Sequence, residues 1–521
     1  MQKDKIIFLN GVSCSEKTKL TKGGKLMRLQ KKRILFLILT VCAFMLLNSC
    51  SNNTESINND GKNIQNNDSD EIISETPGVT ENIYEQFPKI DFEGRKLNFL
   101  ITDYLAEEHR AEEEIGEIFN DAVFRRNKKI EDDYNINFSF IEFGWNDAPD
   151  RLRRSVLAGD NSYDLASMHA VAAAGRTTAG IYSDWRTVPV INENLDNHWW
   201  NRSVVKDLSI GNKCFFIAGD ISYLYIAQNH GFIFNKKLFR DAGMDIPYKT
   251  VKDGNWTYSI FSEMLKGLNT DLNGDGVLKL EDDLFGFTTM SPFADTMYFY
   301  NFGGKIVEKD VDDYPVLVLG DEKNAAIIQA GYDWFIGGNF PLTGYTGNDD
   351  YSVEPGHRAF MEDRIYFLGT NLKNLRVLRN MESEYGILPY PKFNESQENY
   401  ISNVEGAATM LVLPPTADGD FVGTIVEALA RESSLTVIPA YYETTLQQKF
   451  ARDEETIDMV KIIRDTASFD MGYIYNIGGA GFISTALIGQ KSANLASWFE
   501  KNETVIQRAI NQLIEYCKNL N

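Results

Sequence analysis

The chain has 521 residues, of which 43% are hydrophobic and 24% are charged, and this length is too great for a single compact core. Its formal net charge of −22 argues against nucleic-acid-binding proteins, which use basic surfaces. Five cysteines are too few for a disulfide-rich scaffold. We therefore expect a globular protein with two or more domains.

The N-terminus differs from the rest of the chain. Residues 1–49 carry ten Lys or Arg and two Asp or Glu. The remainder of the chain therefore has 42 Lys or Arg and 72 Asp or Glu, a net charge of −30. A basic stretch at 28–33 is followed by an apolar run at 34–47, shorter than the roughly 20 residues of a membrane-spanning helix. This pattern predicts an exported protein with a signal segment. An uncleaved signal anchor is the alternative, and Met27 leaves the true start open.

The apolar run ends in Leu47-Asn48-Ser49-Cys50, which resembles the bacterial lipobox, although Asn48 departs from its usual small residues. The resemblance implies that Cys50 receives lipid and that residues 1–49 are removed. Residues 51–80 are rich in Asn, Asp, Ser and Glu and have almost no aromatic side chains. Such a composition predicts a flexible tether, so we assign 50–91 to the lipidated cysteine and its linker.

From residue 92 onward, periodicity predicts alternating strands and helices. Leu97, Phe99 and Ile101 alternate as in a strand, and apolar residues between 115 and 130 recur at helical spacing. A second alternating run covers 135–143, a second helical pattern covers 152–157, and a third strand begins near 163. This order predicts an α/β fold with a largely parallel sheet flanked by helices.

In parallel α/β sheets, ligands bind beyond the carboxyl ends of the strands. His169 follows the third predicted strand and Trp145 follows the second. We therefore include His169 as a candidate ligand contact, although a lone histidine is often structural. The position of Trp145 draws attention for the same reason.

Several segments, taken in order, resemble extracellular solute-binding proteins of carbohydrate ABC importers, the family 1 type of bacterial lipoprotein. They are NKKIEDDYNIN at 127–137, SYDL at 162–165, FNKKLFRDAGM at 234–244, RAFMEDRIYF at 358–367 and YGILPYPK at 385–392. The resemblance covers most of residues 92–521, but 291–350 does not align. It implies two periplasmic-binding-protein-like lobes joined by hinge strands, a sugar ligand, an ABC permease partner and a location on the outer face of the membrane.

The resemblance assigns 92–219 and 366–412 to the first lobe, and 220–365 and 413–521 to the second. The crossings would lie near 218–220 and 411–413. Ligand would be captured by closure of the lobes, with no cofactor turnover, and we expect a monomer that does not bind nucleic acid.

Sugars present apolar faces and hydroxyl edges, so a sugar site combines aromatic rings with polar side chains. Beside the first crossing, Asp220 supplies a polar side chain and Tyr223 an aromatic ring. Glu405 could reach the ligand from the other lobe. Among the tryptophans we select Trp185 and Trp334, and among the glycines Gly369, where backbone can approach a ligand closely. Core packing for the tryptophans, turn capping for Asp220 and a solvated loop for Glu405 are the alternatives.

Residues 271–282 match the spacing of a calcium-binding loop, with a glycine at the sixth position. The oxygen donors are Asp271, Asn273, Asp275, the carbonyl of Val277, and Asp282. Lys279 occupies the ninth position and cannot act as a ligand, and Asp282 is shorter than the usual Glu. The alternative is an Asp- and Gly-rich turn without metal, so we expect at most a structural Ca²⁺.

We find no nucleophile elbow, HExxH motif or phosphate-binding loop, and the five histidines lack metal-binding spacing. The sequence therefore predicts a non-enzymatic binding protein. A glycosidase, whose two carboxylates leave no sequence signature, stays open, as does a surface sugar receptor that feeds a sensor kinase. Cys214 and Cys517 either pair or, as we favour, stay as separate thiols.

Overall fold

The computed structural model describes residues 87–104, 106–291, 293–344, 354–444 and 453–520. All of them belong to residues 79–521, the second of two compact units in the chain. The predicted signal segment, the lipid site at Cys50 and the linker up to residue 86 lie outside the described residues. Among those described, no helix is both long and apolar enough to span a membrane.

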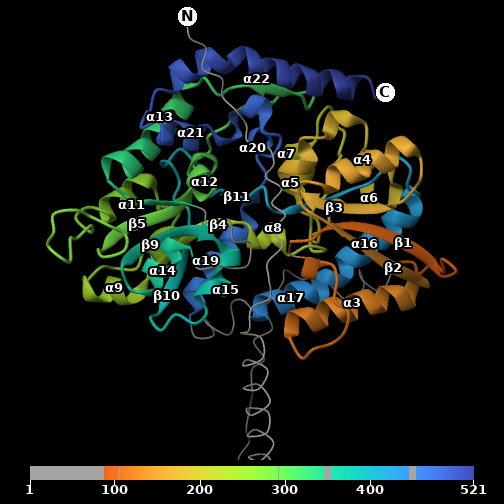
Figure 1. Cartoon of the computed structure of the whole chain (residues 1–521), viewed down its shortest axis with the longest axis horizontal. Coiled ribbons are helices and arrows are strands. Elements are labelled where there is room, and N and C mark those ends of the chain that lie inside the picture. Colours follow the sequence, from red (N-terminus) through yellow and green to blue (C-terminus); the bar gives the residue numbers. More distant parts are fainter. Residues whose placement is uncertain (1–86, 105, 292, 345–353, 445–452, 521) are drawn as a thin grey trace, which may run out of the picture. The chain divides into compact units, whose positions relative to one another are not determined.

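The first sheet has four strands in the order β12-β3-β1-β2, and its strands β3, β1 and β2 are labelled in Figure 1. Its strands are β1 (Arg95–Thr102), β2 (Ile136–Phe143), β3 (Leu165–His169) and β12 (Thr409–Val412). β1 runs parallel to β2 and β3, whereas β12 is antiparallel to β3. Leu97 and Phe99 pack into one hydrophobic cluster and Leu100 into another, so both faces of β1 are covered. This arrangement confirms the predicted mostly parallel α/β architecture.

Helix α3 (Ile118–Tyr134) covers this sheet beside β2. The Glu117 carboxylate caps it by accepting a hydrogen bond from the Asn120 backbone N–H at 2.6 Å. Ile115, expected on the same helical face, lies before this cap and is 65% exposed. Helices α16 (Gly419–Leu435) and α17 (Val437–Tyr442) pack against α3 from a distant part of the chain.

The second sheet has five strands in the order β10-β4-β9-β5-β8. They are β4 (His230–Asn235), β5 (Phe285–Ser291), β8 (Leu342–Gly344), β9 (Ile365–Asn371) and β10 (Tyr385–Pro389). β5 is parallel to β8 and β9, whereas β4 is antiparallel to β9 and β10. Nearly every residue of β4, β9 and β10 is buried, as expected for strands covered on both faces.

The other helices that flank or connect the strands are α4 (Ala148–Ala158), α5 (Ala170–Ala174), α6 (Pro189–Asn192), α7 (Arg202–Leu208), α8 (Leu224–Ala227), α9 (Lys236–Asp241), α10 (Tyr248–Lys252), α11 (Tyr258–Met264), α12 (Ala294–Asn301), α13 (Glu322–Tyr332), α14 (Pro355–Met361), α15 (Leu375–Leu378) and α19 (Glu454–Asp465). Short 3-10 turns include η1 (Ala106–Glu108) and η2 (Thr177–Ala179). A hairpin of β6 (Val307–Lys309) and β7 (Pro315–Leu317) follows α12.

Among the described residues, two segments connect a strand of one sheet to a strand of the other, and the first of them includes α8. The first crossing, residues 217–229, and the second crossing, residues 403–409, run side by side. Ile217 pairs with Leu411 and Asn229 pairs with Val404 in isolated antiparallel bridges. A short parallel pair, β11 (Ser402–Asn403) with β13 (Ala467–Ser468), lies beside them. We call the elements around the first sheet the first lobe and those around the second sheet the second lobe.

The C-terminal helices contact both lobes. Helix α20 (Met471–Ile474) packs on α5 of the first lobe, and α21 (Ile483–Gly489) packs on α12 and α13 of the second. Helix α22 (Leu495–Lys518) contacts η2 and α13, and Figure 1 shows it lying across elements of both lobes. As a result, one hydrophobic cluster extends from Leu100 in the first sheet to Phe232 in the second.

The strand pairing corrects the predicted lobe boundaries. Residues 366–412 were assigned to the first lobe, but β9 and β10 pair within the second sheet, and only β12 joins the first. Residues 413–521 were assigned to the second lobe, yet α16 packs on α3 and α6 of the first. The reason is physical: a buried apolar strand carries no local mark of the sheet it will join, because its partners are distant in sequence.

Candidate functional site

The strand ends of the two lobes face the second crossing. In the first lobe, β1 and β3 end at Thr102 and His169, while antiparallel β12 begins at Thr409. In the second lobe, β9 ends at Asn371, and antiparallel β4 begins beside it at His230. The carboxyl edge of each sheet therefore presents its loops to the same stretch of chain, where ligands of α/β sheets bind.

Glu405, in the second crossing, lies at the centre of this region. Its Oε2 is 3.2 Å from His230 Nε2 and accepts a hydrogen bond from Asn371 Nδ2 at 3.0 Å. Asn371 Nδ2 also donates to Gln228 Oε1 at 2.8 Å. Burial alone would raise the pKa of Glu405, but the contacts with His230 and Asn371 and the charge of Lys373 outweigh it and lower the pKa. The carboxylate is therefore ionised at neutral pH.

Three rings from the first lobe gather beside this carboxylate. The ring of His169 lies 4.8 Å from the ring of Trp145 and 6.2 Å from that of Tyr104. Burial lowers the pKa of His169 to about 4, against a smaller opposing effect of Glu405, so the imidazole is neutral at pH 7. Trp145 is 45% exposed. The group therefore offers an accessible aromatic surface next to a charged acceptor.

The second-lobe edge also contains buried polar atoms that have no hydrogen-bond partner among the described residues. They are Oδ1 of Asn229 and Asn371 and Nδ1 of His230 and His357. His357 Nε2 lies 3.2 Å from the hydroxyl of Thr370, the residue before Asn371. A buried acceptor without a donor is unfavourable by roughly 1–3 kcal/mol. These atoms can be satisfied by a molecule that brings hydroxyl groups.

Comparisons with known proteins bear on the fold. No protein-family model matches the chain, and no curated protein matches it in sequence. An ABC substrate-binding protein from Listeria monocytogenes in complex with cycloalternan is 13% identical, with a TM-score of 0.50, over 82% of this chain and 99% of its own. An extracellular solute-binding protein from Staphylococcus aureus in complex with maltose gives the same four values. A cyclo/maltodextrin-binding protein complexed with maltotetraose is 12% identical, with a TM-score of 0.50, over 82% and 98% of the two chains.

The chain has the two-lobe fold of extracellular solute-binding proteins.

In this solute-binding fold, two of the predicted contacts come together. His169 and Glu405, 236 positions apart in sequence, meet at the junction of the lobes, close enough for the Glu405 charge to affect the pKa of His169. Sequence reasoning missed Tyr104, His230 and Asn371. Tyr104 and Asn371 lie at or just beyond the carboxyl ends of strands, a signal that could have found them. His230 begins an antiparallel strand, which the sequence does not show.

Asp220 and Tyr223 lie in the first crossing, where both are buried. The Asp220 carboxylate accepts a hydrogen bond from the Tyr225 hydroxyl at 2.6 Å, and burial raises its pKa to about 6. The ring of Tyr223 stacks on that of Tyr441 at 4.7 Å. Tyr223 thus holds the crossing against α17, whereas Asp220 joins two residues within the crossing. Their role as ligand contacts stays a prediction.

Trp185, Trp334 and Gly369 occupy core positions. Trp185 has no exposed surface and donates its indole N–H to the Leu411 carbonyl at 3.1 Å. Trp334, in a short π-helix, is 2% exposed and borders a cavity of about 280 Å³ within the second lobe, beside Tyr258 and Phe340. A Cβ at Gly369 would lie 3.0 Å from the Thr289 hydroxyl of the neighbouring strand. We therefore omit these three residues from the candidate site.

The calcium-like loop is well ordered by its own side chains. Asp271 accepts hydrogen bonds from the backbone N–H groups of Gly274 and Gly276, at 2.7 and 2.8 Å. Asp283, one position after the predicted ligand Asp282, accepts from Lys279 N–H at 2.8 Å. The Lys279 ammonium pairs with Asp275 at 2.6 Å. Across the described ranges, no group of three or more His, Cys, Asp or Glu side chains is arranged to hold a metal ion.

Cys214 and Cys517 are both buried free thiols in this structure. Burial raises the pKa of each to about 12, so neither is a reactive thiolate at neutral pH. The two behave as small apolar side chains.

Proposed function

We propose that this protein captures a neutral sugar, an oligosaccharide in our preferred form, between its two lobes and releases it unchanged to a membrane importer. The observation that carries the proposal is the position of Glu405. It lies in a crossing segment, bonds to His230 and Asn371 of the second lobe, and sits beside the rings of the first lobe. A ligand bound there would touch both lobes at once.

The chemistry of the group suits a sugar. Aromatic rings pack against the apolar faces of pyranose rings, and Trp145 provides an exposed ring. The ionised Glu405 and the unpartnered Asn229 and Asn371 oxygens accept hydrogen bonds from hydroxyl groups. The ligands named for the three similar structures, cycloalternan, maltose and maltotetraose, have these features. We therefore place this chain among the carbohydrate-binding proteins of ABC importers.

Ligand capture would follow from differential affinity. A solute that contacts Glu405, the first-lobe rings and Asn371 gains most free energy when the lobes are closed, so it shifts the population toward the closed state. The closed protein would then be recognised by the permease of the importer. In this proposal no covalent step occurs and the protein is not an enzyme.

Export and lipid anchoring complete the proposal. The basic and apolar segment before Cys50 and the polar tether after it support a lipoprotein held on the outer face of the cell membrane. Such an anchor keeps the binding protein close to its transporter. The alternative role, a receptor that passes the sugar signal to a sensor kinase, uses the same binding step and differs in the partner.

Binding is tested with the full chain by thermal shift and calorimetry against maltose, maltotetraose, a cyclic dextrin and ribitol. We expect saturable binding of at least one sugar, and recovery of that sugar intact after long incubation. Trp145→Ala should raise Kd about fivefold, since a ring contact contributes roughly 1 kcal/mol. Trp498→Ala, which removes a tryptophan from α22, is the matched control.

Three results would count against the proposal. Absence of binding across a broad sugar panel would remove the ligand class. Cleavage of the bound sugar would identify an enzyme. Normal sugar uptake in a deletion strain that has lost its sugar-induced gene expression would favour the receptor.

A further inference from the structure

A short segment after β1 touches both crossing segments. It comprises Tyr104 and η1 with the following His109, and we call it the latch (residues 104 and 106–109). Tyr104 borders the candidate sugar site through its ring contact with His169. Its hydroxyl donates a short hydrogen bond to the Ala407 carbonyl in the second crossing. One end of the latch therefore lies between the site and a crossing segment.

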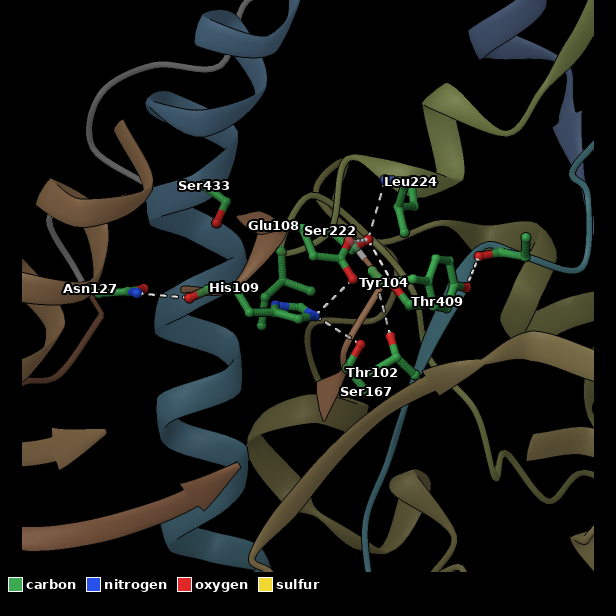
Figure 2. A network of polar contacts seen from close by, with 12 residues as sticks. Thr102, Tyr104, Glu108, His109, Asn127, Ser167, Ser222, Leu224, Thr409 and Ser433 are labelled. Atoms are coloured by element: carbon green, nitrogen blue, oxygen red, sulfur yellow. Dashed lines mark hydrogen bonds and ion pairs between the residues drawn. The ribbon is translucent and has the colours of Figure 1, made fainter. Parts of the chain in front are cut away.

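Glu108 connects the latch to both crossings. Its side chain is 2% exposed, and Figure 2 shows it between the Ser222 and Thr409 hydroxyls. Ser222, from the first crossing, donates a short hydrogen bond to Oε2, and Thr409, at the end of the second, donates to Oε1 at 2.8 Å. The two hydroxyls are also 2.9 Å apart. One carboxylate thus fixes the two crossing segments to each other and to the first lobe.

His109 and Arg126 attach the latch to β3 and α3 of the first lobe. His109 Nε2 lies 3.0 Å from Glu108 Oε1 and 2.8 Å from the Ser167 hydroxyl on β3. The buried Arg126 guanidinium, on α3, donates to the carbonyl oxygens of Glu108 and His109 at 3.3 and 3.2 Å, and to that of Ile221 in the first crossing at 3.3 Å. Burial lowers the pKa of Arg126 to about 10, so it keeps its charge at neutral pH.

Glu107 extends the latch to the second lobe. Its carboxylate pairs with the guanidinium of Arg376, on α15 just beyond the end of β9, at 3.5 Å. The two side chains are 41% and 44% exposed. This contact differs from those of Glu108 because it joins the edges of the two lobes, which separate when a two-lobe protein opens.

We propose that the latch couples the sugar site to lobe closure, with Glu108 as the fixed pivot and Glu107–Arg376 as a contact that joins the lobe edges without ligand and is strengthened when ligand binds. A ligand that settles against Tyr104 would stabilise the segment that carries both residues. Glu107, Glu108 and Arg376 are then positioning residues that tune affinity without touching the ligand. The proposal rests on the proposed sugar capture for its purpose, but its structural content can be tested without any ligand.

The first test is a charge swap, followed by hydrogen–deuterium exchange of the ligand-free full chain. Glu107→Arg places two cations opposite each other, and we expect amides of β9 and α15 to exchange about two- to tenfold faster. Adding Arg376→Glu should restore the original rates. Asp150→Arg is the matched control, because Asp150 pairs with Arg176 inside the first lobe at 3.3 Å and at similar exposure, 49% and 42%. That variant should leave β9 and α15 unchanged.

The second test addresses the pivot with an isosteric change. Thr409→Val removes one of the two hydroxyl groups that donate to Glu108. We expect the backbone amides of both crossings to exchange faster. Thr424→Val is its control, since the buried Thr424 hydroxyl bonds to the Asp420 carbonyl within α16 alone. Unaltered exchange in Glu107→Arg or in Thr409→Val, or failure of the double swap to restore the rates, would overturn the latch.

A binding measurement distinguishes failure of the latch proposal from failure of the proposed sugar capture. With maltotetraose as the probe, Glu107→Arg should raise Kd about two- to fivefold, mainly through faster dissociation, and the double swap should recover it. If exchange responds as expected but no sugar binds, the latch stands and sugar capture falls. If sugar binds and exchange does not respond, sugar capture stands and the latch falls.

Discussion

Glu405 shows how one side chain can be both buried and charged. Removal from water would favour its neutral form, yet the contacts with His230 and Asn371 and the charge of Lys373 keep its pKa low. An ionised acceptor forms stronger hydrogen bonds than a neutral one. The carboxylate is therefore suited to hold a hydroxyl group of a ligand.

We predict that Glu405→Gln, which keeps the size but removes the charge, raises the Kd for a bound sugar by roughly tenfold, or about 1.4 kcal/mol. Isothermal titration calorimetry measures the change. Glu427→Gln is the control, because Glu427 is also buried but accepts from Trp200 and Arg431 inside the first lobe, at 2.9 and 2.7 Å. That variant should lose stability and keep its affinity. Wild-type affinity in Glu405→Gln would remove this residue from the site.

His357 makes stability depend on pH. Burial lowers its pKa to about 4 in the folded protein, whereas the unfolded chain has the ordinary value near 6.5. Between these values only the unfolded state binds the proton. The stabilisation is therefore complete above pH 6.5 and is lost as the pH falls toward 4, by about 3 kcal/mol. Urea unfolding at several pH values should give a flatter profile for His357→Gln; an identical slope would contradict the assignment.

The crossing segments depend on close backbone contact. A Cβ at Gly219 would lie 2.1 Å from the Trp199 carbonyl oxygen and 3.0 Å from the Trp200 Cα, both of which are backbone atoms. Trp200 and Gly219 form a bridge, so neither side can move without breaking it. The first crossing therefore needs a glycine at this position.

We expect Gly219→Ala to lower the free energy of unfolding by about 1–3 kcal/mol, as overpacking usually does. Chemical denaturation of the full chain measures the loss. The control is Gly489→Ala at the end of α21, where an added Cβ meets nothing within 4 Å. Because alanine favours helices, that change should be neutral or slightly stabilising. A stable Gly219→Ala protein would show that the bridge is not tightly packed.

Calcium binding by residues 271–282 stays a prediction, as does its structural role. We expect Ca²⁺ to raise the melting temperature relative to the same protein in EGTA, because a ligand that binds only the folded state stabilises it. Asp271→Asn should abolish the difference, since Asp271 is the first donor of the loop and also orders it through Gly274 and Gly276. Equal melting temperatures in Ca²⁺ and EGTA would leave a metal-free turn.

The two lobes are not independent bodies. The C-terminal helices α20, α21 and α22 contact elements of both lobes, and one hydrophobic cluster runs through them. A movement that opens the candidate site must preserve these contacts. We therefore infer that the C-terminal helices and the Glu108 pivot keep their contacts, and that the lobes separate at the edge joined by Glu107 and Arg376.

For the intact protein in its cell, the lipid prediction is the one to test first. Cys50→Ala should shift the protein from membrane to soluble fractions, because the polar tether has no membrane affinity of its own. The distribution is read by fractionation and immunoblotting. Ser49→Ala, which keeps a small residue before the cysteine, should stay in the membrane. Retention of Cys50→Ala in membranes would indicate an uncleaved anchor.

Local patterns predicted much of the fold. The alternation at Leu97, Phe99 and Ile101 and the run at 135–143 became β1 and β2, and the helical spacing beyond residue 117 became α3. The positions of His169 and Trp145 after strands placed both near the candidate site. Periodicity and strand ends are properties of neighbouring residues, so a sequence contains them directly.

Only the tertiary structure decided which sheet each strand joins and which side chains meet. β9 and β10 pair in the second sheet, and Trp185 and Trp334 are buried in the hydrophobic cores. Glu405 contacts His230 and Asn371. These outcomes depend on contacts between residues tens to hundreds of positions apart, for which composition and spacing carry no signal. The sequence by itself determined the class of fold and the exported character we expect; packing decided the site.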